Sequence, residues 1–460
     1  MISFPGETGV ISQPVIPDTP VGIVFIDWLE SFNLGELEQM QSFDEKHCQG
    51  EAPPMAPMLD FREQTGGFAL LRIIRSEPFS LIVIIQEKHS DTVAQLEMSV
   101  SSEDPQQMLN LNLFMTARPA DLAIERMTES AALKALSAHA ESESKHDRFS
   151  GALLIAKQGK ILLQECWGLA DRESGKAISL DTQFRLGSIN KMFTAVAILQ
   201  LIEKRQLTLD DPIGNHLTDY PHKETASKVT VRHLLTHTGG TGDIFGPAFN
   251  KNRLALKEHS DYLKLYGERA LTHEPGSEHQ YSNFGYVLLG ALIENLSSVS
   301  YNQFMRDNIF LPVGMTSTDS EPETSNVLNR CKSYTRDDGK WLPNADFLPW
   351  SGNAAGGGYS TVGDLFRFSK ALESDSLISR AMLIEATRLQ TEDYGFGFEL
   401  SGEGLLQNYG HGGGAPGMNG MIRIYPKLGY LLIGLSNFDP RAATRLIDYY
   451  EHRMPLTSPL

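Results

Sequence analysis

An α+β architecture in more than one domain is the fold class that this sequence predicts, and two observations support it. Near the N-terminus, two short amphipathic helices precede four runs that are rich in Ile, Leu and Val. In the remaining chain, strand-like runs lie near both ends, and a long stretch of helices and loops separates them. This order predicts an antiparallel sheet that is assembled from distant segments, flanked by helices and accompanied by a helical lobe.

The first domain is expected over residues 21–117, after a flexible lead-in of residues 1–20 that is rich in Pro and Gly. The pattern predicts two helices and then four strands, over residues 23–32, 37–43, 68–75, 80–88, 92–99 and 108–116. Neighbouring strands are expected to pair antiparallel. This order is loosely similar to nuclear-transport-factor-like domains, which are often fused to enzymes. No cluster of charged residues there indicates a catalytic site, so we assign the domain a packing, lid or dimerisation role. A homo-oligomer would be expected to form through this domain.

The second domain is expected over residues 124–455. A helix is predicted over residues 121–143, and a hairpin follows, with its turn at Gln158-Gly159 between two apolar strands. Near the C-terminus, the pattern predicts two strands and a final helix, over residues 420–425, 429–436 and 441–450. The residues between these ends form the helical lobe, and a cleft between lobe and sheet is the expected ligand site.

The composition is that of an ordinary globular protein, with 41% hydrophobic and 21% charged residues among 460. A net charge of −17 argues against nucleic-acid binding, which relies on Lys and Arg to neutralise phosphates. No apolar run approaches the roughly 20 residues that span a bilayer, and the N-terminus has no signal-peptide pattern. We expect a cytoplasmic protein as the sequence is written, and a periplasmic or secreted one if a signal has been removed.

We expect neither a metal nor a cofactor. The three cysteines, Cys48, Cys166 and Cys331, have no disulfide or zinc spacing, and inert thiols are the favoured interpretation, with one bridge left open. His233 and His237 have the i, i+4 spacing of a metal pair, but the Glu of His-Glu-x-x-His and a third ligand are missing. His237 is instead expected as a cation near a helix C-terminus. No P-loop and no dinucleotide glycine fingerprint occurs.

The pair Ser188 and Lys191 is the first candidate for chemistry, because it forms Ser-x-x-Lys at the start of a long apolar segment. On a helix, residues three apart lie on one face. An amine that burial keeps neutral can take the proton of a serine hydroxyl, which is a poor nucleophile on its own. The alternative is a solvated helix face with no function. The residues around Ser188 lack a Gly-x-Ser-x-Gly elbow, which disfavours the α/β-hydrolase fold.

Two further groups could complete such a site. Tyr281 and Asn283 lie in a loop that leads into an apolar helix, where the simple interpretation is helix capping. A functional Tyr281 would act as base or proton shuttle, with Lys191 as the cation that lowers its pKa. The second group is His411 with Gly412, Gly413 and Gly414, either a flexible glycine turn or a backbone that approaches substrate and donates to an oxyanion.

Taken together, Ser-x-x-Lys, Tyr-Ser-Asn and His-Gly-Gly resemble, in that order, the motifs of the serine β-lactamase and penicillin-binding-protein superfamily. The resemblance is to the branch with class C β-lactamases, D-alanyl-D-alanine carboxypeptidases, D-aminopeptidases and β-lactamase-like esterases. It extends over about residues 124–450 and includes the stretches LLTHTGG, FLPVGMTST, AAGGGYSTVGDLFRFSKAL, YGFGFEL and GYLLIGLSN. It implies the β-lactamase/transpeptidase-like fold for the second domain.

The resemblance also implies roles for single residues. Ser188 would be the acylated nucleophile, Lys191 its activating partner and Tyr281 a base or proton shuttle. Asn283 would contact substrate, and His411, Gly412 and Gly413 occupy the place of the Lys-Thr-Gly strand motif. The backbone N–H groups of Ser188 and Gly414 would then form the oxyanion hole.

The third motif departs from the family pattern, because β-lactamases and cell-wall peptidases have Lys where His411 stands and a hydroxyl where Gly412 stands. A largely neutral histidine should hold a substrate carboxylate less well. We therefore expect a serine hydrolase that works through an acyl-enzyme on ester or amide bonds of a small molecule or short peptide. An esterase or a D-amino-acid-type peptidase is favoured over a β-lactamase. The alternatives are a genuine β-lactamase and a ligand-binding sensor that does not turn over.

Overall fold

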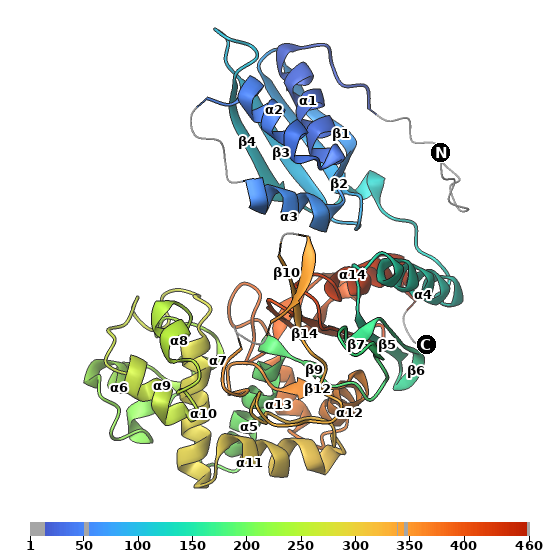
Figure 1. Cartoon of the computed structure of the whole chain (residues 1–460). Coiled ribbons are helices and arrows are strands. Elements are labelled where there is room, and N and C mark those ends of the chain that lie inside the picture. Colours follow the sequence, from blue (N-terminus) through green and yellow to red (C-terminus); the bar gives the residue numbers. More distant parts are fainter. Residues whose placement is uncertain (1–13, 50–54, 338, 345–347, 458–460) are drawn as a thin grey trace. The chain divides into compact units, whose positions relative to one another are not determined.

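A computed structural model describes residues 14–49, 55–337, 339–344 and 348–457 of the chain (Figure 1). The chain divides into two compact units, Met1–Glu125 and Arg126–Leu460. Each unit has its own antiparallel sheet and its own hydrophobic core.

The N-terminal unit is a four-stranded sheet with helices packed on one of its faces (Figure 1). Its strands pair in chain order, which confirms the predicted antiparallel meander. The rings of Trp28, Phe32 and Phe68 stack between the first helix and the sheet. The sequence pattern does not predict α3, because its apolar residues form no continuous face. The elements are α1 (Pro20–Leu34), α2 (Leu37–His47), α3 (Met55–Thr65), β1 (Phe68–Glu77), β2 (Ser80–Glu87), β3 (Val93–Val100) and β4 (Met108–Met115).

The second unit is built on a six-stranded antiparallel sheet whose strands come from both ends of its sequence, as predicted. The turn of the first hairpin has positive φ at both central residues, 50° at Gln158 and 70° at Gly159, which suits the right-handed twist of the strands. The spatial order is β13 (Glu399–Ser401), β14 (Asn408–Ala415), β15 (Met418–Tyr425), β16 (Tyr430–Ser436), β5 (Gly151–Lys157) and β6 (Lys160–Trp167).

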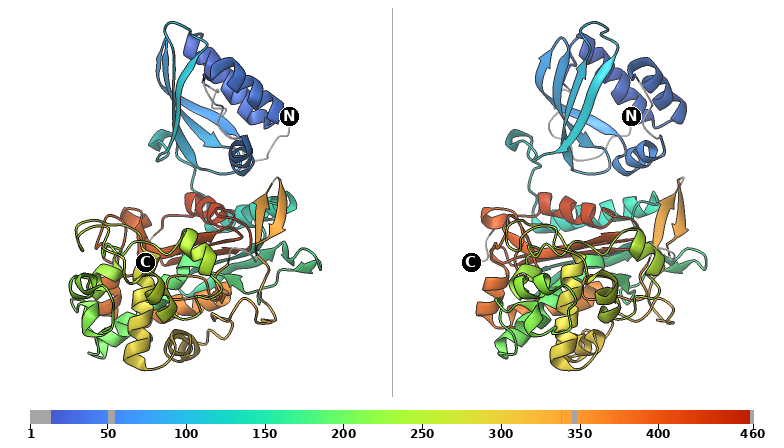
Figure 2. Two further views of the ribbon diagram at one scale, coloured as in Figure 1. Left: turned by 60° about the vertical axis from the view of Figure 1, so that its left-hand side comes forward. Right: turned by 90° about the vertical axis from the view of Figure 1, so that its left-hand side faces the viewer.

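Helices cover both faces of this sheet (Figure 2). On one face, α4 (Glu129–Lys145) and α14 (Thr444–Arg453) enclose a small core with β5 and β16. On the other face, α5 (Asn190–Glu203) and α12 (Val362–Glu373) belong to a larger core that continues into the lobe. The helices of the lobe and its borders are α6 (Lys223–Lys228), α7 (Val231–Leu235), α8 (Pro247–Asn252), α9 (His259–Tyr266), α10 (Asn283–Ser297), α11 (Tyr301–Met305) and α13 (Arg380–Ala386).

Short strands complete the second unit: β7 (Leu169–Asp171), β8 (Lys176–Ala177), β9 (Phe184–Arg185), β10 (Tyr334–Asp337), β11 (Lys340–Pro343) and β12 (Tyr359–Ser360). Strand β9 comes just before the turn that carries Ser188, and it pairs antiparallel with β12. Residues 355–357, just before β12, line the same pocket as Ser188.

In the second unit, three predictions differ most from the structure. The helix predicted over 121–143 begins only at Glu129, because the Thr128 hydroxyl caps it by accepting the Ala131 N–H. The final helix begins at Thr444, not at residue 441. The glycine-rich segment is a regular strand, β14, which pairs with β13 and β15, so the interpretation as a flexible turn is wrong.

Candidate active site

Ser188 lies in a short 3-10 turn, Gly187–Ile189, that leads directly into α5. Helix α5 is buried from Asn190 to Leu201, as its apolar sequence predicts. The turn packs closely on β14, since a Cβ atom added to Gly187 would lie 3.0 Å from the Gly414 nitrogen. Ser188 itself is half-buried and borders a pocket. The nucleophile candidate therefore lies at the junction of helix and sheet.

Lys191 is fully buried behind Ser188, and its amine has three polar neighbours. The Nζ atom is 3.2 Å from Ser188 Oγ and 2.8 Å from Asn283 Oδ1, and it donates to the Ala355 carbonyl. Burial lowers the pKa of Lys191 to about 7, although the carboxylates of Asp243 and Glu399 oppose this shift. At neutral pH a large fraction of the amine is therefore unprotonated and able to accept a proton.

Tyr281 precedes α10 and faces the same amine. Its ring centroid is 4.7 Å from Lys191 Nζ, and a hydrogen bond connects the phenol to Ser188. Burial of the phenol raises the pKa of Tyr281, although the residue keeps 37% of its surface exposed at the pocket. The prediction that Lys191 lowers this pKa is wrong, because burial of the phenol disfavours its charged form and outweighs the effect of the nearby amine.

Gly414 presents its backbone to the same place. Strand β14 has β13 on one side and β15 on the other, and the Gly412 N–H donates to the Glu399 carboxylate on the β13 side, at 2.8 Å. Because alternate N–H groups of a strand point the same way, the Gly414 N–H also points away from β15. Strand β13 ends before it can pair there. This N–H group thus lies beside the Ser188 turn, which is the geometry of an oxyanion hole.

The pocket in front of Ser188 has a volume of about 250 Å³ and is mostly apolar. Its polar lining includes Tyr281 and Asn283, together with Asn344 and Asn353. Among the residues that the structure describes, none of those lining the pocket carries a charge. The apolar side chains are those of Ile244, Phe245, Phe249, Leu348, Pro349 and Met418.

His411 does not line this pocket among the described residues. Its side chain is 1% exposed, with Nε2 2.9 Å from the Tyr394 hydroxyl and Nδ1 3.3 Å from Glu399. Burial lowers the pKa of His411, so the imidazole is neutral near pH 7. The structure therefore brings Gly414 to the pocket but turns the His411 side chain toward Tyr394, and the predicted substrate contact of His411 stays a prediction.

His237 lies behind Tyr281, with the two ring centroids 4.2 Å apart. Its Nδ1 accepts the Ser282 N–H at 3.1 Å, and its backbone has a φ of 57° just after α7. Burial lowers the pKa of His237 well below 6.5. The prediction of a cationic histidine is therefore wrong: the ring is a neutral packing partner that holds the loop before α10.

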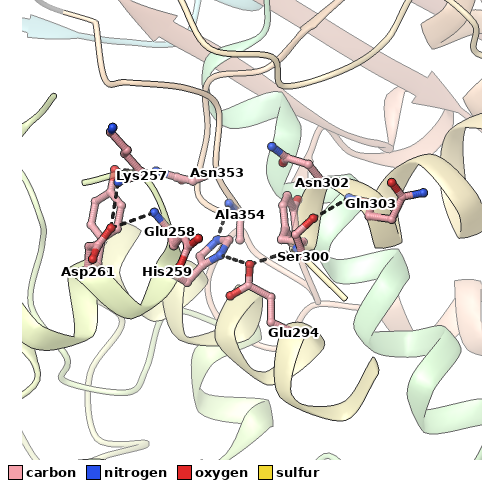
Figure 3. A network of polar contacts seen from close by, with 12 residues as sticks. Lys257, Glu258, His259, Asp261, Glu294, Ser300, Asn302, Gln303, Asn353 and Ala354 are labelled. Carbon is pink, nitrogen blue, oxygen red and sulfur yellow. Dashed lines mark hydrogen bonds and ion pairs between the residues drawn. The ribbon is translucent and has the colours of Figure 1, made fainter. Parts of the chain in front are cut away.

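A buried polar network holds the segment that supplies Ala355. Figure 3 shows His259 between Glu294 and the backbone of Ala354. His259 Nδ1 is 3.0 Å from the Glu294 carboxylate, and Nε2 is 3.2 Å from the Ala354 nitrogen. Since Ala355 is the next residue, this network fixes a carbonyl that contacts Lys191.

Replacing His259 with alanine is expected to destabilise the protein by about 2 kcal/mol, because the buried Ala354 N–H loses its acceptor. Activity should fall as well, since the Ala355 carbonyl loses its support. The midpoint of urea-induced unfolding and kcat/KM measure both effects. Lys257→Ala, at an exposed position just before the same helix, is the matched control and should change stability by less than about 0.5 kcal/mol. If His259→Ala changed neither the stability nor kcat/KM, the claim that this network supports the Ala355 carbonyl would be contradicted.

Sequence reasoning missed Asp243 and Ala355 as parts of the site. Asp243 accepts hydrogen bonds from Asn283 Nδ2 at 3.0 and 3.1 Å, and Ala355 accepts one from Lys191. Asp243 follows the glycines of LLTHTGG by three residues, and Ala355 lies in AAGGG. Both stretches stood out as similar to the family, and that similarity was the only signal for them.

Comparisons with known proteins identify the family of the second unit. Residues 123–453 match the family model described as Beta-lactamase. A penicillin-binding protein of Bacillus subtilis (strain 168) is 33% identical over 328 residues, 65% of this chain and 70% of the relative. Esterase EstB of Burkholderia gladioli is 29% identical over 56% of this chain and 74% of its own length. A D-aminopeptidase of Brucella anthropi is 25% identical over 58% of this chain and 52% of its own.

Solved structures share the fold of the second unit. A penicillin-binding protein from Bacillus halodurans superimposes with a TM-score of 0.62 at 26% identity, over 67% of this chain and 97% of that chain. An octameric penicillin-binding protein homologue from Pyrococcus abyssi superimposes with a TM-score of 0.61 at 26% identity, over 72% of this chain and 79% of that chain. Within the described part of this chain, no helix is long and apolar enough to cross a membrane.

Proposed function

This chain belongs to the beta-lactamase family, and from that premise we propose that it is a serine hydrolase that works through an acyl-enzyme on Ser188. Ser188 Oγ attacks a carbonyl carbon while the lone pair of Lys191 takes the hydroxyl proton. The N–H groups of Ser188 and Gly414 hold the oxyanion. The proton then passes to the leaving alcohol or amine as its bond to carbon breaks, and water hydrolyses the ester on Ser188 by the reverse route.

The buried, partly neutral Lys191 is the observation that carries this proposal. A surface lysine would be protonated at pH 7 and could not act as a base. Here burial lowers the pKa of Lys191 to about 7, and the amine lies 3.2 Å from the attacking oxygen. A general base is most effective when its pKa is near the working pH. Tyr281, whose pKa is raised, remains protonated and can donate to or relay protons through Ser188.

The pocket favours uncharged acyl groups. Its described lining is largely apolar and without charge, and the neutral His411 points elsewhere. A substrate carboxylate would lose its hydration there without gaining a cation. We therefore propose ester or amide substrates, with esterase or D-amino-acid peptidase activity favoured over β-lactam hydrolysis. The esterase and D-aminopeptidase among the relatives support this choice.

Steady-state turnover of a short-chain p-nitrophenyl ester, measured beside nitrocefin, tests this proposal. We expect ester turnover and at least 100-fold slower nitrocefin turnover. Fast nitrocefin hydrolysis would make the protein a β-lactamase instead. Stoichiometric release of nitrophenol without further turnover would identify a sensor that is acylated and stays so.

A further inference from the structure

Four polar groups form one continuous hydrogen-bonded chain that ends at the attacking oxygen. Asn283 Nδ2 donates to both carboxylate oxygens of Asp243, at 3.0 and 3.1 Å. Asn283 Oδ1 accepts from Lys191 Nζ at 2.8 Å, and Nζ is 3.2 Å from Ser188 Oγ. Asp243 is the member of this chain that no sequence motif assigned.

The numbers of donors and acceptors determine which group donates and which accepts in each of these hydrogen bonds. A carboxylate has only acceptor oxygens, so the Asn283 amide must turn its NH₂ group toward Asp243 and its oxygen toward Lys191. A neutral amine has two N–H groups and one lone pair. Asn283 Oδ1 and the Ala355 carbonyl are both acceptors only, so they take the two N–H groups. The lone pair is then left to face the Ser188 hydroxyl, which is the arrangement that a base requires.

The loop that carries Asp243 is itself held in place. The carboxylate accepts the Ile244 N–H at 2.6 Å, and Arg269 Nη1 donates to the Asp243 carbonyl at 2.7 Å. Two residues before Asp243, the hydroxyl of Thr241 is 2.9 Å from that of Ser282. Ser282 precedes Asn283, so the two ends of the Asp243–Asn283 contact are tied to each other.

We propose that Asp243 is a positioning residue, which orients the Asn283 amide so that the Lys191 lone pair faces Ser188. This inference rests on the proposed function, because it assigns Asp243 to the activation of the same nucleophile. Asp243 acts through Asn283, and it is absent from the described lining of the pocket. A carboxamide in its place could donate or accept, so the Asn283 amide would be free to reverse. A reversed amide would occupy the lysine lone pair and turn an N–H group toward Ser188.

Some of the ionisable groups around Lys191 are charged near pH 7 and change its pKa, whereas others are neutral. Of the charges, Asp243 and then Glu399 raise the pKa of Lys191 against the larger effect of burial. The nearby imidazoles of His237 and His411 have lowered pKa values, and the phenols of Tyr281 and Tyr286 have raised ones. All four are neutral near pH 7, so Asp243 and Glu399 are the charged groups that influence Lys191 there. Removing Asp243 should therefore lower the pKa of the lysine.

The test is the pH profile of ester kcat/KM for Asp243→Asn. We expect the plateau to fall about 100-fold, which is within the usual contribution of a general base. Because activity requires neutral Lys191, the acidic limb should also move to lower pH. Asp210→Asn, which removes an equal charge from a side chain that is 79% exposed, is the matched control and should leave plateau and limb unchanged. A plateau within twofold of wild type, or a reduced plateau with an unmoved limb, would overturn the proposal.

Exchanging the two side chains gives a second test that does not depend on the folding of Asp243→Asn. In Asn283→Asp alone, two carboxylates face each other, and activity should be low. Adding Asp243→Asn restores a donor facing an acceptor and keeps an oxygen toward Lys191. The double variant should therefore be at least tenfold more active than Asn283→Asp, with its acidic limb at higher pH than wild type. A double variant no better than the single one would overturn the inference. Dependence of wild-type turnover on Ser188 tests the proposed function separately.

Discussion

Replacing Ser188 with alanine is expected to lower kcat/KM for an activated ester by about 10⁴-fold or more, because the substitution removes the attacking oxygen. The change removes one oxygen from a half-buried position, so the free energy of unfolding should change by less than about 1.5 kcal/mol. Steady-state kinetics and thermal melting of the same preparation measure both quantities. Loss of less than tenfold would contradict Ser188 as the nucleophile.

Replacing Lys191 with methionine is expected to lower kcat/KM by about 10³- to 10⁴-fold, because the Ser188 hydroxyl loses its base. Methionine has a similar length and fits a site from which water is excluded. In the wild type, kcat/KM should rise with pH through an apparent pKa near 7, since only the neutral amine accepts the proton. The methionine variant should lack this acidic limb. A limb that persists in the variant would show that another group titrates.

The same substitution should leave the protein at least as stable as the wild type at pH 7. Keeping the lysine neutral there costs about 5 kcal/mol, given a pKa near 7 in the fold and 10.5 as the reference. Leaving the Asn283 and Ala355 oxygens unpaired offsets most of the gain, at about 1–3 kcal/mol each. The unfolded chain binds more protons between pH 7 and about 10, so wild-type stability relative to the variant should rise with pH across that range. Urea unfolding at pH 7 and pH 9 measures this difference.

The reacting groups could be predicted from the sequence because they lie in short, ordered motifs. Ser188 and Lys191 share one helix start, and Tyr281 and Asn283 share one helix entry. Local spacing is enough to place each pair, and the resemblance to a known family relates the pairs to one another. The antiparallel sheet followed in the same way, since alternating or continuous apolar runs mark β5, β15 and β16.

The supporting groups could not be predicted, because their roles arise only from tertiary contacts. In the sequence, Asp243 is only an acidic residue in a glycine-rich loop. Its role depends on the contact with Asn283, at the start of α10. The chemistry of His411 depends on Tyr394 and Glu399, which precede it by 17 and 12 residues on a neighbouring segment. The pKa of Lys191 is a property of the whole core around α5, which no local pattern encodes. Glycines also carry no side-chain pattern, so strand β14 could be read from sequence as a turn.

For the N-terminal unit, the sequence predicts the structure but does not determine the role. Its helices and meander follow from apolar periodicity, and the structure confirms that order. A role in packing, as a lid or in dimerisation stays a prediction, because such a role depends on a surface and its partner.

The most direct test of Ser188 activation is the rate of covalent labelling by a fluorophosphonate as a function of pH. Trypsin should release the modified serine in the peptide of residues 186–191, LGSINK, where mass spectrometry locates it. We expect the label on Ser188, with a rate that rises to a plateau through an apparent pKa near 7. A label on another residue, or a rate without an inflection in that range, would contradict activation of Ser188 by Lys191.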